Sequence, residues 1–177
     1  PISSPAHTED GTRLASTNLT GLIRIWDTRT WSLMAELAGH VTVEPPMRVC
    51  LAWSPDNKTL VSGGDDGRLV AWETTTFEQR ILLEDEQSVR GVTWSPDGLR
   101  IAACGSWGET TLQEGGYVTI LDVVTGAPLH RIIHRETSDD LHTIEWSPDG
   151  SRLASGGCIH GQMQVWDPDE GQLLHSV

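Results

Sequence analysis

Several residue types are scarce in this 177-residue chain, and each scarcity excludes a class of protein. Lysine and arginine together number 12 against 25 acidic residues, and the formal charge of -13 opposes binding to the phosphate backbone of nucleic acids. No stretch approaches the roughly 18 consecutive apolar residues that a membrane-spanning helix needs, and no signal-peptide pattern opens the sequence. We therefore expect neither a nucleic-acid partner nor a membrane.

Cysteine is also scarce, and its placement favours a reducing compartment. Cys50, Cys104 and Cys158 form an odd set without a CxxC pair, which argues against a disulfide framework and against a zinc knuckle. His130 and His134 are four residues apart, and on a strand this separation is about 13 Å, too far for one metal ion. No glycine-rich phosphate loop precedes a helical pattern. We therefore expect a cytoplasmic protein with no metal site and no cofactor.

The sequence has an internal repeat instead. The string Trp-Ser-Pro-Asp occurs at 53–56, 94–97 and 146–149, and each copy is followed by an apolar-small run such as TLVSGG or RLASGG. A fourth copy of this run begins at Arg13. Each run precedes an alternating segment that ends in an apolar-acidic pair, at 22–27, 68–73, 117–122 and 162–167. A period of 41 to 52 residues indicates one supersecondary unit per repeat.

Apolar residues within each repeat alternate with a step of two, which predicts β-strands. Each repeat predicts four short strands, named a to d in chain order, with tight turns at the Ser-Pro-Asp and Asp-Asp-Gly segments. A four-stranded antiparallel sheet cannot bury both of its faces alone, so neighbouring repeats must stack. In the second repeat we place the strands at 48–54, 59–64, 68–73 and 79–84.

These repeats resemble the WD-repeat β-propellers over almost the entire chain. The resemblance is carried by the Ser-Pro-Asp turns, the Gly39-His40 pair, and the pairs Trp26-Asp27, Trp72-Glu73, Leu121-Asp122 and Trp166-Asp167. It implies an all-β fold in which four-stranded antiparallel blades surround a channel and serve mainly as a protein-binding platform. The regular turns are similar to those of bacterial WD-repeat chains. The single domain at 1–177 would hold about four blades, at approximately 1–40, 41–85, 86–135 and 136–177.

The resemblance also implies a structural tetrad in the second blade, formed by His40, Ser62, Asp66 and Trp72. Asp66 would hold the imidazole of His40, His40 would bond Ser62, and Ser62 would bond the indole N–H of Trp72. Serine, histidine and aspartate are also the residue types of a hydrolase triad, but their register in the repeat favours the structural role. The first and fourth blades keep only the serine and the tryptophan, and the third blade has Ala103 and Leu121 in their places.

Four blades do not obviously make a ring. The first blade has only the stub PISSP where strand a should lie, followed by a polar insertion, AHTED. WD-repeat propellers resemble rings of seven or eight blades, so four would leave apolar faces exposed on the first and last blades. We expect half of a larger propeller, completed by a second copy in a homo-oligomer or by blades outside this sequence. A small closed ring of four blades is the alternative.

The long insertions of the sequence all follow strands b and d, whose loops share one face of the disc. Trp107 lies in the longest insertion, outside the repeat register, and would either anchor a partner or fold back over the third blade. Acidic residues gather on this face and would attract a basic segment of a protein partner. The candidate partner-binding residues are Trp107, Glu84, Asp85, Glu86, Glu109, Glu114, Glu136, Asp139 and Asp140.

Together these features favour a non-catalytic protein-interaction scaffold. Two alternatives stay open. One is an enzyme with its active site at the channel mouth of a completed propeller, although nothing in the spacing of the acidic residues singles out a catalytic pair. The other is a purely structural half-propeller that assembles with itself. We expect Trp31, which follows strand c of the first blade, to pack on the adjacent c–d loop.

Overall fold

The computed structural model describes residues 3–41, 47–85, 87–106, 115–134, 141–157 and 161–176. The strands of these residues form four antiparallel sheets of four strands each, and consecutive strands pair within every sheet. The first sheet contains β1 (Ser3–His7), β2 (Arg13–Thr17), β3 (Ile23–Asp27) and β4 (Ser32–Leu37). The second contains β5 (Val49–Trp53), β6 (Thr59–Gly64), β7 (Arg68–Glu73) and β8 (Gln79–Glu84).

The third sheet contains β9 (Ser88–Trp94), β10 (Arg100–Ser106), β11 (Gly116–Asp122) and β12 (Pro128–His134). The fourth contains β13 (Leu141–Trp146), β14 (Leu153–Gly157), β15 (Met163–Asp167) and β16 (Gln172–Ser176). The prediction of an all-β fold with four four-stranded antiparallel blades is confirmed. None of the described residues forms a helix long and apolar enough to cross a membrane.

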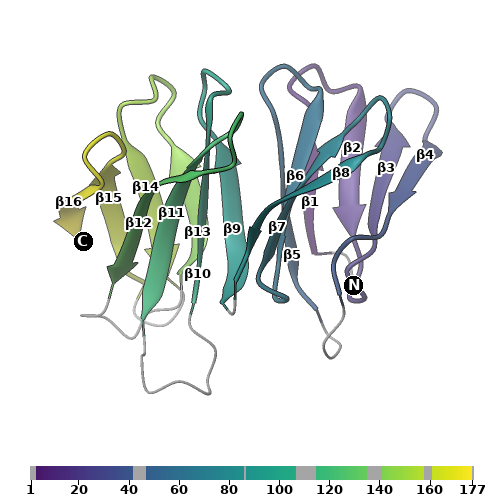
Figure 1. The fold of residues 1–177 in the computed structure, drawn as a ribbon. Helices are drawn as coiled ribbons and strands as arrows, with labels where there is room; N and C mark the ends of the chain where they lie inside the picture. Colours follow the sequence, from purple (N-terminus) through teal and green to yellow (C-terminus); the bar gives the residue numbers. More distant parts are fainter. Residues whose placement is uncertain are drawn as a thin grey trace.

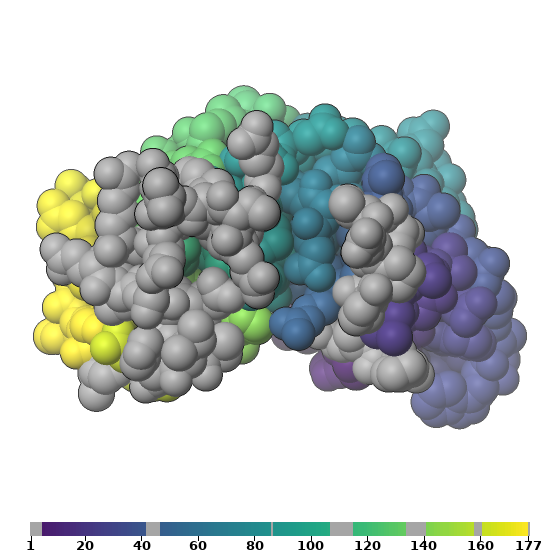
Figure 2. All heavy atoms as spheres, turned by 90° about the horizontal axis from the view of Figure 1, so that it is seen from below, coloured from purple at the N-terminus to yellow at the C-terminus, as the bar shows by residue number. Residues whose placement is uncertain are grey.

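The four blades follow one another along an arc (Figure 1). Each strand a contacts the strand a of the next blade, β1 with β5, β5 with β9, and β9 with β13. Seen from below, the colour runs from purple at one end of the arc to yellow at the other, and the two ends do not meet (Figure 2). The arrangement is that of a partial propeller.

The hydrophobic core consists of three clusters, one between each pair of neighbouring blades. Alternate residues of strands b and c point to opposite faces of a sheet, so each inner blade contributes to two clusters. In the second blade Leu60 and Trp72 pack toward the first blade, whereas Val61 and Leu69 pack toward the third. Full burial of one such aliphatic side chain stabilises a fold by about 1.5–3 kcal/mol. Blade stacking is therefore the main source of stability.

Strand β1 corrects the expectation that the first blade has only a stub in place of strand a. Ala6 and His7 pair with Ala15 and Leu14 of β2, so part of the expected polar insertion belongs to the strand. The register shifts between Ser3 and Ala6, a segment that contains a proline, which lacks the N–H group that a regular ladder requires. The indole N–H of Trp53 donates to the Ala6 carbonyl at 3.1 Å and ties β1 to the second blade.

Gly39 follows β4 and covers the strand-c tryptophan of the second blade. A Cβ atom at this position would overlap the indole of Trp72 and the side-chain amide of Gln79. Trp72 is 2% exposed and its indole is held by a hydrogen bond, so the ring cannot move aside. The glycine of the Gly39-His40 pair therefore allows the end of the first blade to lie flat on the second.

The three Ser-Pro-Asp turns have the same hydrogen-bond pattern. In each, the serine hydroxyl donates to the aspartate at 2.5–2.6 Å, and the aspartate accepts the N–H of the second residue after it. These bonds hold the pKa of Asp56, Asp97 and Asp149 below its ordinary range, to about 2 for Asp149, with the serine hydroxyl as the largest cause. The turns are therefore built around ionised carboxylates.

Acid should destabilise the protein through these turns. Because each folded-state pKa lies below the unfolded value of about 3.9, the carboxylates stabilise the fold above that pH, and this stabilisation disappears as the pH falls toward about 2. We expect the free energy of unfolding, measured by urea titration with tryptophan fluorescence, to fall steadily between these values. Asp149→Asn should flatten the dependence, and an unfolding free energy that stays constant down to pH about 2.5 would contradict the prediction.

Candidate binding face

The connections between strands divide into two rims of different character. The connections after strands a and c form the short-loop rim, and each has four to six residues, at 8–12, 28–31, 54–58, 74–78, 95–99, 123–127, 147–152 and 168–171. The connections after strands b and d form the long-loop rim and have three to eleven residues, at 18–22, 38–48, 65–67, 85–87, 107–115, 135–140 and 158–162. Variation in length is therefore concentrated on the long-loop rim.

One continuous chain of hydrogen bonds anchors this rim in the second blade. The indole of Trp72 donates to Ser62 Oγ at 2.8 Å, and Ser62 Oγ lies 2.8 Å from His40 Nε2. His40 Nδ1 lies 2.9 Å from Asp66 Oδ1. Because an indole can only donate, the hydroxyl proton of Ser62 is available to His40 Nε2, and Nδ1–H then faces the carboxylate.

Asp66 also fixes the loop that precedes the second blade. Its Oδ2 accepts the backbone N–H of Val41 at 2.8 Å, and the side chains of His40 and Asp66 are 0% and 3% exposed. Burial alone would raise the pKa of Asp66, but the hydrogen bond and charge of His40, together with the N–H groups of Val41 and Arg68, hold it below its ordinary value. The tetrad thus joins a d–a loop to a b–c turn.

The other blades contain shorter versions of this network. Trp26 donates to Ser16 at 3.0 Å in the first blade, and Trp166 donates to Ser155 at 2.9 Å in the fourth. In the third blade Ala103 and Leu121 are both 0% exposed and apolar contact replaces the polar chain. The second blade alone, among those described, therefore holds all four residues of the tetrad.

His40→Ala should destabilise the fold more than removal of a single bond elsewhere. The variant leaves Ser62 and Asp66 buried without this partner, at a cost of about 1–3 kcal/mol for each group. Ser16→Ala is the matched control because it removes the bond that Trp26 donates at the equivalent place in the first blade, for which we expect about 1 kcal/mol. Urea unfolding monitored by circular dichroism compares the two variants, and equal losses of stability would contradict the anchoring role.

Three of the described acidic residues at the long-loop rim are paired with arginines. Glu84 lies 2.7 Å from Arg68 and Asp85 lies 2.6 Å from Arg131. Asp65 lies 3.8 Å from Arg90 and accepts the backbone N–H of Arg48 at 2.9 Å. Two of the predicted partner-binding residues, Glu84 and Asp85, therefore already have cationic neighbours within the fold. The sequence pattern did not predict these ion pairs, because each arginine and its acidic partner lie in different segments of the chain.

The remaining predicted partner-binding residues lie outside the described residues. They are Glu86, Trp107, Glu109, Glu114, Glu136, Asp139 and Asp140. The segments 42–46, 86, 107–114 and 135–140 contain seven acidic residues and one arginine. By sequence, seven acidic residues against one arginine give these segments a formal net charge of -6.

A groove of about 570 Å³ opens between the inner strands near the short-loop rim. The ends of β1, β5 and β9 line it, and Glu145 of β13 reaches it from the fourth blade. Burial raises the pKa of the Glu145 carboxyl. In the part of the chain that the structure describes, no group of three His, Cys, Asp or Glu side chains is placed to hold a metal ion. No sequence pattern predicted this groove, although Trp53 and Trp94, which end strand a in two of the Trp-Ser-Pro-Asp strings, line it.

Trp31 corrects a further expectation. It has a positive φ of 57° and is 69% exposed, so it does not pack on the c–d loop. With Leu14, Ser16 and Trp26 it lines an apolar cavity of about 280 Å³ on the outer face of the first blade. The cavity lies over Trp26, the first-blade counterpart of Trp72. In the second blade, the end of the first blade covers Trp72.

Cys50 and Cys104 are free thiols on strands β5 and β10. Burial raises the pKa of Cys50 to about 12 and that of Cys104 well above its ordinary value. Both thiols are therefore protonated at neutral pH and poor nucleophiles, and Cys104, at 0% exposure, packs as a small apolar residue. Cys158 lies outside the described residues.

Comparison with known proteins agrees with this architecture. The family model "WD domain, G-beta repeat" matches residues 31–73, 78–111 and 126–167. Protein hir-1 of Neurospora crassa is 31% identical over 167 residues, covering 83% of this chain and 16% of that protein. Meiotic fizzy-related protein 2 of Schizosaccharomyces pombe is 30% identical over 182 residues, covering 99% of this chain and 33% of that protein. The chain thus spans a third or less of these relatives, which are eukaryotic and give no support to the expected bacterial type.

Solved structures show the same fold. A chain of the mitotic checkpoint complex superimposes with a TM-score of 0.81 at 24% identity, covering 99% of this chain and 52% of that one. A chain of hydrazine synthase from Kuenenia stuttgartiensis superimposes with a TM-score of 0.80 at 19% identity, covering 98% and 47%. At these identities the likeness concerns the fold alone. Each matched segment begins at strand d of one blade and continues into the next blade. Because the family model matches most of the sequence, the chain belongs to the WD-repeat family.

Proposed function

We propose that this protein is a non-catalytic interaction scaffold that binds a protein partner through the long-loop rim. The observation that carries the proposal is the contrast between the two rims. The short-loop rim has connections of four to six residues, whereas the long-loop rim has connections of up to eleven. Loops that vary in length on a regular framework are where binding functions are usually built.

The tetrad and the ion pairs support this assignment because they fix the base of the rim. Val41 and Arg48 flank a long connection, and both donate their backbone N–H groups to aspartates of the next b–c turn. A partner that binds loops held at their bases loses less conformational entropy than one that must order free segments. The rim is therefore a preorganised support for the loops.

The charge of the rim supports a partner with a basic segment. Glu84, Asp65 and Asp85 lie beside arginines, whereas the insertions contain seven acidic residues and one arginine and so add negative charge to the rim. Such a field accelerates the approach of a cationic segment and is screened by salt. The mitotic checkpoint complex contains a chain of the same fold, which fits a role for this fold in protein assemblies.

Neutralising the insertions should weaken the binding of basic peptides. The probe is an array of fifteen-residue peptides with graded lysine and arginine content. The triple change Glu109→Gln, Glu114→Gln and Glu136→Gln should reduce binding at least roughly threefold, because each exposed charge pair contributes about 0.2–1 kcal/mol. The matched control is Glu9→Gln, Glu78→Gln and Glu170→Gln, which changes the same charge on the short-loop rim. Equal effects of the two triple variants, or binding that is insensitive to salt, would contradict the proposal.

Trp107→Ala separates the two roles considered for this tryptophan. If Trp107 anchors the partner, the variant should lose peptide binding by about tenfold or more, the scale of an interface hot spot, and keep its free energy of unfolding. If it packs on the third blade, urea unfolding should reveal a loss of stability instead. Trp31→Ala, which alters an exposed tryptophan of the first blade, is the control for binding.

A further inference from the structure

Strands β9 and β13 each contain one residue more than the pairing with their neighbour requires. The ladder between β9 and β10 skips Arg90, and the ladder between β13 and β14 skips His142. Strand β5 of the second blade pairs with β6 without such a shift. A β-bulge of this kind leaves its extra residue outside the ladder and re-aims the side chain. The third and fourth blades therefore have an extra residue at the same place, near the start of strand a.

The two extra residues meet across the interface between these blades. Arg90 Nη1 lies 3.0 Å from His142 Nε2. Gly91 permits this approach, since a Cβ atom there would lie 3.1 Å from the backbone oxygen of His142. A guanidinium has only donors, so Nε2 accepts the bond and the imidazole is neutral, with its proton on Nδ1. The contact is thus a hydrogen bond that exists only while His142 is uncharged.

Asp65, in the b–c turn of the second blade, is a further partner for Arg90. Arg90 Nε lies 3.8 Å from Asp65 Oδ1, which is longer than a hydrogen bond of about 2.7–3.2 Å. The two side chains are 22% and 31% exposed, so water screens their charges only in part. The guanidinium therefore has a close neutral acceptor in the fourth blade and a more distant carboxylate in the second.

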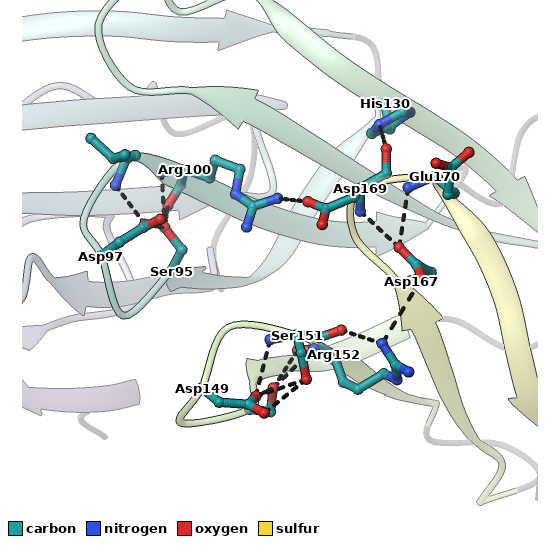
Figure 3. A network of polar contacts seen from close by, with 12 residues as sticks. Ser95, Asp97, Arg100, His130, Asp149, Ser151, Arg152, Asp167, Asp169 and Glu170 are labelled. Carbon is teal, nitrogen blue, oxygen red and sulfur yellow. Dashed lines mark hydrogen bonds and ion pairs between the residues drawn. The ribbon is translucent and has the colours of Figure 1, made fainter.

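Strand β13 packs on β9, β10 and β14. Besides Arg90 and His142, the ionisable side chains of these four strands are Arg100, Cys104 and Glu145. Burial raises the pKa of the Cys104 thiol, which is therefore uncharged. Arg100 donates to Asp169 at 2.7 Å in a c–d turn of the short-loop rim (Figure 3), and Glu145 lines the groove near the same rim. Neither lies at the long-loop end of the strands, where Arg90 meets His142.

We propose that His142 is a pH-sensitive switch that transfers Arg90 from the fourth blade to the second. At neutral pH the uncharged ring accepts the guanidinium and joins β13 to β9. As the pH falls below about 6.5, where imidazoles ordinarily titrate, the ring gains a proton, loses its acceptor and repels the guanidinium. Arg90 then closes on Asp65 in a charge-assisted hydrogen bond. The switch acts within the fold and does not rest on the proposed partner.

The direction of the pH dependence follows from the hydrogen bond. Protonation breaks the bond in the folded protein, whereas an unfolded chain has no such bond to lose. The contact between Arg90 and His142 therefore stabilises the fold above about pH 6.5, and this stabilisation disappears as the pH falls through that range. This range lies well above that of the Ser-Pro-Asp turns, so the two effects can be measured separately.

His130, at the same interface, makes a contact of the opposite kind. Its Nε2 lies 2.9 Å from the backbone carbonyl of Asp169 (Figure 3). A carbonyl can only accept, so the ring donates its N–H, and a charged ring keeps this donor. Protonation therefore breaks the contact between the strands a of the two blades and leaves the contact of β12 with the c–d turn intact.

His142→Gln tests the switch because the glutamine side chain offers a neutral acceptor at every pH. We would measure the unfolding equilibrium constant by urea titration at about pH 7.5 and about pH 5.5. The increase of this constant on acidification should be roughly 2- to 10-fold smaller in His142→Gln than in the parent, the value of one hydrogen bond. His130→Gln is the matched control and should keep the parent's increase. Equal increases in the parent and His142→Gln would overturn the proposal.

Nuclear magnetic resonance of the histidine rings tests the transfer of Arg90. The resonance of His142, assigned by its absence in His142→Gln, should titrate at lower pH in the parent than in Arg90→Ala, because a neighbouring cation opposes protonation. Asp65→Asn should move the titration to still lower pH, because the guanidinium then has no carboxylate to close on. Asp85→Asn, which removes a carboxylate paired with Arg131, is the control of equal charge and should have a smaller effect.

Two outcomes of the titration would overturn the proposal. One is that His142 titrates at the same or a higher pH in the parent than in Arg90→Ala, as expected if a carboxylate of the connection at 135–140 holds a charged ring. The other is that Asp65→Asn and Asp85→Asn have equal effects, since Asp65 would then not receive the guanidinium.

Discussion

A four-stranded sheet with apolar residues on both faces is not stable in water until other sheets cover those faces. In this chain neighbouring blades cover one another, and the side chains buried between them form three clusters. Between the first and second blades, the strand-c tryptophan Trp72 meets the flat end of the preceding blade at Gly39. The other features of the molecule rest on this stacking.

Stacking also explains why the two rims differ. Strands must keep their register for the apolar faces to meet, and the Ser-Pro-Asp turns keep it on the short-loop rim with the same hydrogen bonds three times over. The long-loop rim has no such uniform turn, so its connections can lengthen without disturbing the clusters. Within the longest connection, Asp66 of the tetrad accepts the N–H of Val41 and the neighbouring Asp65 accepts that of Arg48.

The repeat made much of the fold predictable. The strands expected at 59–64, 68–73 and 79–84 coincide with β6, β7 and β8, because alternation and turn residues both mark their ends. Strand β1 was missed because its pairing depends on backbone groups of β2 and on Trp53, which a local reading of a polar segment does not reveal. The pairing of Asp85 with Arg131 was missed for a related reason, since it joins side chains 46 positions apart in the sequence.

The contacts between neighbouring strands a determine which blades unfold first. Within the described residues each blade packs on its immediate neighbours, so unfolding of an inner blade exposes two clusters, whereas detachment of an outer blade exposes one. Fraying therefore starts at β16 or at β4 and moves inward one sheet at a time. Amide protons of β6 and β10, in the two central blades, are then the slowest to exchange with solvent, because local unfolding proceeds from the two outer blades toward the centre.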